Sequence, residues 1–169
     1  KRHAIGELRF PEGRLHEDEF FTYRALARAD RVAHTEAAHY FYRVRAGSIM
    51  ASEIDPKRAR DALAAYRERA DYISNHGPED LVGPAREQVF RRYLPLYRSL
   101  AAPTLSDQRA ALREEMREAA RTLRSEPVGR GFKAFSTAYA QAPALVDLVY
   151  RGQLRVRRIT RRRRPHSAI

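Results

Sequence analysis

The chain has 169 residues, no cysteine and a formal net charge of +12, with an isoelectric point near 10.6. This length suffices for one domain with its own core, and the lack of cysteine excludes disulfides, thiolate metal sites and a thiolate nucleophile. So strong a positive charge favours polyanionic partners, namely nucleic acid, phosphorylated sugars or an anionic membrane surface. No apolar run of about eighteen residues occurs, so no segment is expected to span a membrane by itself.

The first 54 residues have a mixed pattern. Residues 9–13 contain proline and glycine and indicate a loop. The apolar residues of 18–29 recur at helical spacing and predict a helix. Residues 31–35 alternate and predict a short strand, and the aromatic-rich residues 39–44 predict a second one.

The pattern from residue 55 onward is helical. Asp55 is expected to cap a helix that begins at Pro56 and ends near Ser74. A second helix is predicted at 84–100, kinked or divided by Pro95, and Ser106 is predicted to cap a third that ends before Pro127. A fourth helix is expected at 131–140 and a fifth from residue 143. The positions predicted to form a helix–helix core are Leu63, Tyr66, Tyr72, Ile73, Leu112, Met116, Ala119 and Leu123.

The C-terminal stretch from residue 145, LVDLVYRGQLRVRRITRRRRP, places apolar residues ahead of seven arginines at 155, 157, 158 and 161–164. Such a tail would be attracted to an anionic lipid surface, with about 1 kcal/mol for each basic residue near it. Nucleic acid is the least favoured partner, because no helix-turn-helix, zinc-finger or RNA-binding sheet pattern accompanies the charge. A solvated end without a partner is the third interpretation.

Two stretches about twenty residues apart carry a more specific signal. Residues 9–21 read RFPEGRLHEDEFF, and residues 40–50 read YFYRVRAGSIM. Together they resemble the second half of the catalytic domain of family 2 glycosyltransferases, in particular the bacterial enzymes that build capsules, teichoic acids and other cell-envelope glycans. The family pattern is F-x-x-G, a short gap, E-D, a helix, a strand and Y-Y-R-x-R-x-x-S, and this sequence supplies each part in that order.

The resemblance implies a fold and a reaction. The fold class would be α+β and mostly α-helical: residues 1–54 form a truncated GT-A-type α/β remnant with one helix and two short strands, residues 55–154 a helical C-terminal domain, and residues 155–169 a basic tail. The reaction would be an inverting transfer from a nucleotide-sugar donor to a glycan, polyol-phosphate or lipid-linked acceptor. The expected location is the cytoplasm, at the inner face of the cell membrane. Whether the chain forms a homo-oligomer is left open by the resemblance.

The resemblance assigns the central role to Asp18, the Asp of the Glu-Asp pair. In such a transfer the acceptor hydroxyl loses its proton in the transition state, and a carboxylate that accepts it contributes about a hundredfold to ten-thousandfold. A helix start would keep Asp18 ionised. His16 and Glu17 beside it would bind substrate. The competing interpretation is that acids in a first turn only complement the helix dipole.

Three residues of the second motif are assigned to binding. Arg43 and Arg45 alternate along the predicted strand and therefore face the same side. Guanidinium groups suit the negative charge that develops on a leaving diphosphate. Ser48 would add a hydroxyl or backbone N–H. The resemblance places these residues beside the donor diphosphate or the acceptor, whereas the pattern alone is more typical of a half-buried strand with surface charge than of a binding site.

The sequence lacks the Asp-x-Asp motif and the Gly-rich phosphate loop of a complete family 2 enzyme. The resemblance implies that a divalent metal, Mg²⁺ or Mn²⁺, would be held by an N-terminal half, and we predict no metal ligand in this chain. Because the chain opens at Lys1, we expect a fragment of a longer transferase that is inactive alone. The rival hypothesis is a non-catalytic basic helical module that docks on an anionic membrane or on nucleic acid.

Overall fold

The computed structural model describes residues 5–41, 55–146 and 148. Its helices are α2 (Glu17–Ala27), α3 (Pro56–His76), α4 (Val82–Ser99), α5 (Ser106–Ser125) and α6 (Arg130–Gln141), with short 3-10 helices η1 (Glu79–Leu81) and η2 (Pro103–Leu105) before α4 and α5. The prediction of a mostly helical chain is confirmed, and these described residues contain no strand.

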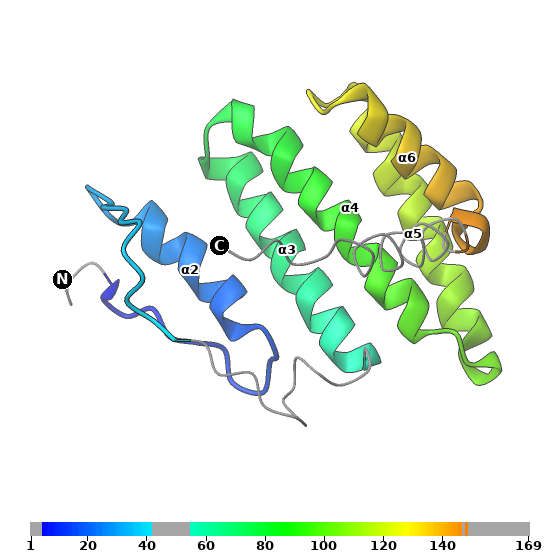
Figure 1. Cartoon of the computed structure of the whole chain (residues 1–169), viewed down its shortest axis with the longest axis horizontal. Helices are drawn as coiled ribbons and strands as arrows, with labels where there is room; N and C mark the ends of the chain where they lie inside the picture. The colour runs from blue at the N-terminus through cyan, green and yellow to red at the C-terminus, as the bar shows by residue number, and fades with distance from the viewer. Residues whose placement is uncertain (1–4, 42–54, 147, 149–169) are drawn as a thin grey trace, which may run out of the picture.

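The helices stand in a row in chain order, and each packs against the next, as Figure 1 shows. Helices α3 to α6 run alternately in opposite directions, so short turns connect neighbours. Helix α2 runs parallel to α3, because Leu15 before α2 contacts Asp61 and Tyr23 farther along contacts Glu68. The described chain is therefore a series of antiparallel helices, α3 to α6, with α2 added on the outer side of α3.

Local signals define the ends of α3. The Asp55 carboxylate accepts a hydrogen bond from the Arg58 N–H at 2.9 Å, and Pro56 takes the first helical position, where a missing N–H costs nothing. The helix continues past the predicted end to His76. There the Gly77 N–H bonds to the Ile73 carbonyl at 2.8 Å, and a Cβ on Gly77 would lie 2.9 Å from that carbonyl oxygen. Glycine thus permits the close approach that ends the helix.

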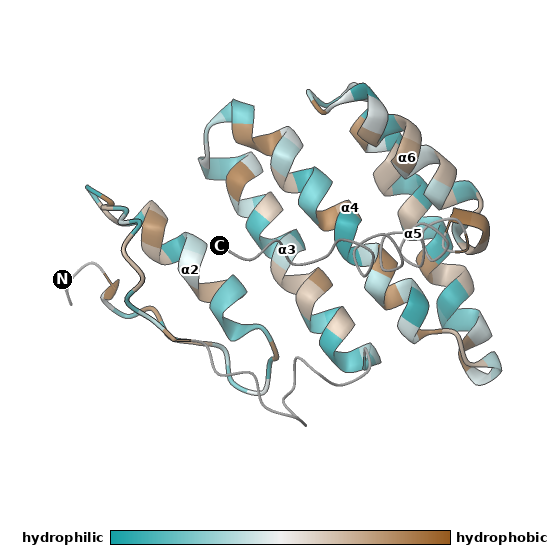
Figure 2. Ribbon diagram, in the orientation of Figure 1, coloured by the Kyte–Doolittle hydropathy of each residue, from teal (hydrophilic) through white to brown (hydrophobic). Residues whose placement is uncertain are grey.

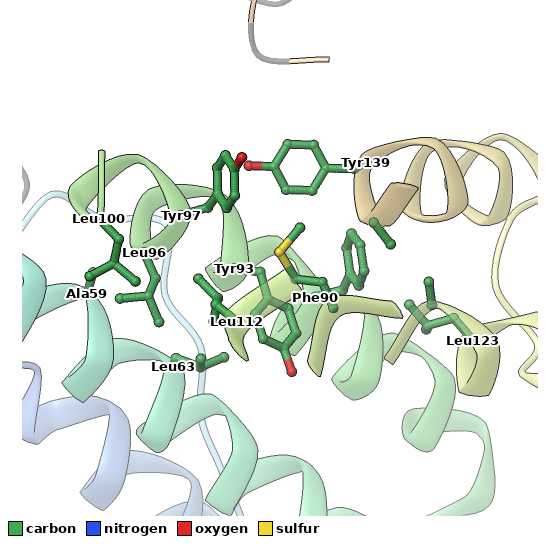
Figure 3. Packing of buried hydrophobic residues seen from close by; sticks show 13 residues of the cluster. Ala59, Leu63, Phe90, Tyr93, Leu96, Tyr97, Leu100, Leu112, Leu123 and Tyr139 are labelled. Atoms are coloured by element: carbon green, nitrogen blue, oxygen red, sulfur yellow. The ribbon is translucent and has the colours of Figure 1, made fainter. Parts of the chain in front are cut away.

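The hydrophobic core lies between α3, α4, α5 and α6 (Figure 3). Phe90 of α4 stands near its centre, edge-on to Phe132 and Tyr139 of α6 with ring centroids 6.0 and 6.3 Å apart. Figure 2 shows hydrophobic residues interspersed among hydrophilic ones along the helices, as amphipathic packing requires. Of the predicted core positions, the fully buried ones are Leu63, Tyr66, Leu112, Met116 and Leu123, and the partly buried ones are Tyr72, Ile73 and Ala119.

Two details of the predicted helices need correction. Helix α4 continues through Pro95, so the proline does not divide it, because buried residues on both sides keep the helix packed on the core; the kink, which was the alternative, stays a prediction. Ser106 does not cap α5. The 3-10 helix η2 leads directly into α5, Leu105 takes the cap position, and Ser106 is already helical, with its hydroxyl bonded to Asp107.

The strand predicted at residues 31–35 is also wrong. Residues 30–41 are exposed and form neither helix nor strand. A strand needs a partner for its backbone N–H and C=O groups, and the described ranges offer none. Of the second predicted strand, residues 39–41 are irregular and residues 42–44 lie outside the described part. Of the one helix and two strands predicted for residues 1–54, the described residues 5–41 therefore contain the helix, α2, and no strand.

Candidate active site

A buried acid on α3, Asp61, holds the loop that leads into α2. Its carboxylate accepts hydrogen bonds from the Leu15 backbone N–H and the Arg14 guanidinium, both at 3.0 Å, and from the Lys57 ammonium at 2.8 Å. Lys57 also donates to the Gly13 carbonyl at 3.0 Å. Residues 13–15 are thereby attached to the first turns of α3.

The electrostatics of Asp61 keep its carboxylate ionised, and so able to accept these hydrogen bonds, at neutral pH. Burial alone would raise the pKa of its carboxyl, but the hydrogen bonds from Leu15, Lys57 and Arg14 more than offset burial and lower the pKa to about 2. Asp61 is only 5% exposed, whereas its two cationic partners reach solvent. The buried charge is therefore paired, as a buried carboxylate requires.

Glu19, in the first turn of α2, forms a second attachment to α3. Its carboxylate accepts hydrogen bonds from the Tyr66 hydroxyl at 2.9 Å and from Arg69 at 3.0 Å. One turn of α2 farther on, Tyr23 makes a third polar contact with α3 and donates to Glu68 at 2.8 Å. Phe20, the buried residue of α2, lies between these polar contacts in sequence. Together these contacts fix which face of α2 is turned toward α3.

These attachments leave Glu17 and Asp18 on the exposed side of the same turn. Neither side chain forms a hydrogen bond or ion pair with another residue of the described ranges. The free backbone N–H groups and the dipole of a helix N-terminus favour negative charge there. Asp18 therefore presents a carboxylate to solvent from a turn that Glu19 and Asp61 hold in place, which is what a general base for an external hydroxyl needs.

His16 stands at the cap position of α2 in a left-handed conformation, with φ 60° and ψ 41°, and its side chain caps nothing. Among the described residues it is the only non-glycine with positive φ. This conformation costs a non-glycine residue about 1–2 kcal/mol. It is held because the Leu15 N–H bonds to Asp61 and the His16 carbonyl accepts the Glu19 N–H at 3.1 Å. Such strain is found at functional sites, and here it sets the direction in which α2 leaves the loop.

The second half of the predicted site, Arg43, Arg45 and Ser48, lies outside the described residues, so its place beside Asp18 stays a prediction. Sequence reasoning missed the two attachments made by Glu19 and Asp61. A signal for Asp61 existed, since it is an acid among the apolar positions of α3, four residues after Lys57.

The acids near α2 do not form a metal site. Glu19 and Asp61 each bind cationic side chains of α3, and within the described ranges no group of three or more His, Asp or Glu side chains is placed to hold an ion. None of the helices in the same ranges combines the length and apolar composition that crossing a bilayer requires. Comparison with known protein families, curated proteins and solved structures finds no match to this chain.

Proposed function

We propose that the chain is the C-terminal part of an inverting family 2 glycosyltransferase of GT-A type. It would help move a sugar from a nucleotide-sugar donor to a cell-envelope polysaccharide, teichoic acid or lipid-linked acceptor. The paired motifs at 9–21 and 40–50 support this proposal. The observation that carries it is a contrast within one helical turn: Glu19 is bound to α3, whereas Asp18, one residue earlier, is exposed to solvent.

In the proposed reaction the acceptor hydroxyl oxygen attacks the anomeric carbon of the donor sugar. The bond from that carbon to the diphosphate oxygen breaks with its electron pair, and the hydroxyl proton passes to the Asp18 carboxylate. Attack from the face opposite the diphosphate inverts the configuration. A base in this position contributes about a hundredfold to ten-thousandfold to the rate.

The remaining roles follow from the chemistry of the side chains. His16 and Glu17, beside Asp18, would contact acceptor hydroxyls. Arg43, Arg45 and Ser48 would contact the diphosphate or the acceptor, because guanidinium groups form paired hydrogen bonds with phosphate oxygens. The divalent metal of the complete enzyme would be held by residues outside this chain.

The test is the Asp18→Asn variant of the complete enzyme. We expect sugar transfer to be abolished, while the dissociation constant of the nucleotide-sugar donor stays within about twofold, because a general base acts in the transition state and not in donor binding. Asp30→Asn is the matched control: Asp30 is exposed just after α2 and should leave transfer unchanged. Near-normal turnover of the Asp18 variant would remove this residue from the mechanism.

A second candidate function uses the other end of the described chain. Leu145 and Leu148 are 61% and 68% exposed and stand directly before the arginine-rich residues 155–164. Exposed leucines followed by arginines suit the surface of an anionic bilayer. The chain would then be cytoplasmic and peripheral to the membrane. Replacing Arg161–Arg164 by glutamine should weaken binding to phosphatidylserine-containing vesicles, and unchanged binding would favour a solvated end.

A further inference from the structure

A hollow of about 360 Å³ lies between α3 and α5, over the C-terminal half of α4. Helices α3 and α5 run in the same direction, and both pack on α4. Two polar contacts reach from α3 to α5: Arg60 donates to Gln108 at 2.9 Å, and Arg67 donates to Glu115 at 2.5 Å. Arg60 and Arg67 are about two helical turns apart, which is about 10 Å. The hollow is therefore a short trough with a polar contact at each end.

The inside of this hollow is apolar. Ala64 of α3 and Ala111 of α5 form its long sides, and their methyl groups leave room between the two helices. Its floor consists of leucines from three helices that lie close together in Figure 3, namely Leu63, Leu96, Leu100 and Leu112. These leucines belong to the hydrophobic core, which fixes their positions before any ligand binds.

The two ends of the hollow differ in their hydrogen-bonding capacity. At one end the Arg67 guanidinium and the Glu115 carboxylate form an ion pair. At the other end Arg60 binds only the neutral amide oxygen of Gln108, and no carboxylate of the described residues pairs with it. With that oxygen occupied, the amide of Gln108 and the guanidinium of Arg60 both offer N–H groups. This end therefore suits a ligand that accepts hydrogen bonds.

The acids of the neighbouring turns do not line the hollow. Asp61 and Glu68 are bound by cationic side chains of α2 or the loop before it, and Glu114 is bound by arginines of its own helix. Asp107 accepts a hydrogen bond from the hydroxyl of the preceding residue. The lining has two arginines and one glutamate, so its formal charge is +1.

We propose that this hollow binds an aliphatic carboxylate such as a medium-chain fatty acid. The alkyl chain would lie on the leucine floor, and the carboxylate would accept hydrogen bonds from Arg60 and Gln108. Small-molecule sites are typically apolar hollows of about 300–1,000 Å³ with a few converging polar groups, and a guanidinium matches the two oxygens of a carboxylate. The site lies on the side of α3 away from α2, and it does not depend on the proposed transfer reaction.

The experiment is an NMR titration of the chain with octanoate, kept below the concentration at which it forms micelles. We expect the methyl signals of the four floor leucines to shift along one saturating curve. Octanol has the same alkyl chain without the charge. It should bind about threefold to tenfold more weakly, because it cannot form the charge-assisted hydrogen bonds with Arg60.

Two variants with matched controls locate the binding. Ala64→Leu extends a larger side chain into the hollow and should weaken the octanoate dissociation constant by about tenfold or more. Ala110→Leu, at an exposed position of α5 outside the lining, should change it less than about twofold. Arg60→Gln should weaken octanoate binding by about threefold or more and leave octanol binding unchanged. Arg124→Gln, at an exposed position in the last turn of α5, should affect neither ligand.

Each of four results would overturn the proposal. Unmoved leucine signals in the unmodified chain would do so without any variant. Shifts that begin only where octanoate forms micelles would show that it acts as a detergent. Equal weakening by the Ala64 and Ala110 variants would place the binding outside the hollow. Octanol binding as tight as that of octanoate would refute the role of Arg60. The titration does not involve Asp18, so none of these results bears on the proposed function.

Discussion

Asp61→Asn should detach the loop at residues 13–15 from α3. Folding lowers the pKa of this carboxyl from its ordinary value of 3.8 to about 2. By linkage, such a change contributes about 2 kcal/mol to the unfolding free energy at neutral pH. We therefore expect the variant to lose about 2 kcal/mol at pH 7, which corresponds to a fall in Tm of about 4–8 °C for a chain of this length.

The pH dependence of this loss has a definite sign. Because the pKa of Asp61 is depressed in the folded state, its stabilisation is complete above the unfolded value near 3.8 and is lost as the pH falls toward about 2. The unfolding free energies of the unmodified chain and the variant should therefore converge between about pH 5 and pH 2. Urea unfolding, monitored by circular dichroism at several pH values, measures the difference in unfolding free energy between the two proteins. The control is Asp71→Asn, an exposed acid on the same helix, with a change below about 0.5 kcal/mol.

Two results would refute this account of Asp61. Equal unfolding free energies for Asp61→Asn and the unmodified chain at pH 7 would show that the attachment contributes nothing. A difference that stays constant from neutral to acidic pH would show that the lost stability does not come from the charge of the carboxylate.

Two further pairs of variants test the start of α2 and the core. His16→Val should lower the unfolding free energy by about 1–2 kcal/mol in urea unfolding, because a β-branched residue does not fit the left-handed conformation. His16→Gly should not lower it, because glycine adopts this conformation without strain. Equal unfolding free energies for the two variants would contradict the left-handed backbone at residue 16. Met116→Ala should cost about 2–5 kcal/mol in the same assay, because this side chain is 0% exposed. Leu145→Ala, at an exposed position, should cost less than about 0.5 kcal/mol, and a comparable loss at both positions would contradict the described core.

Sequence patterns predicted the elements whose signals are local. Asp55 and Pro56 start α3 as expected, and residues 131–140 fall within α6. The patterns failed at residues 31–35 and at Ser106, for two different reasons. Residues 31–35 alternate like a strand, but a strand forms only beside another one. Ser106 has the chemistry of a cap, but the 3-10 turn before it already continues into the helix.

The candidate site likewise has one part that the sequence predicted and one part that it did not. The exposed acid Asp18 at a helix start was visible in the sequence, because first-turn acids follow a local rule. The residues that hold this turn were not visible, because their partners are far away along the chain. Glu19 reaches Arg69 across 50 residues, and Asp61 reaches the Leu15 N–H across 46. No periodicity within one helix encodes such pairs.

The single-turnover rate of sugar transfer by the complete enzyme, measured with saturating donor, tests the role of Asp18 most directly. A carboxylate that takes the acceptor proton predicts that Asp18→Asn slows this step by about a hundredfold to ten-thousandfold with donor affinity retained. A single-turnover rate within about threefold of the unmodified enzyme would contradict the assignment of Asp18 as the base.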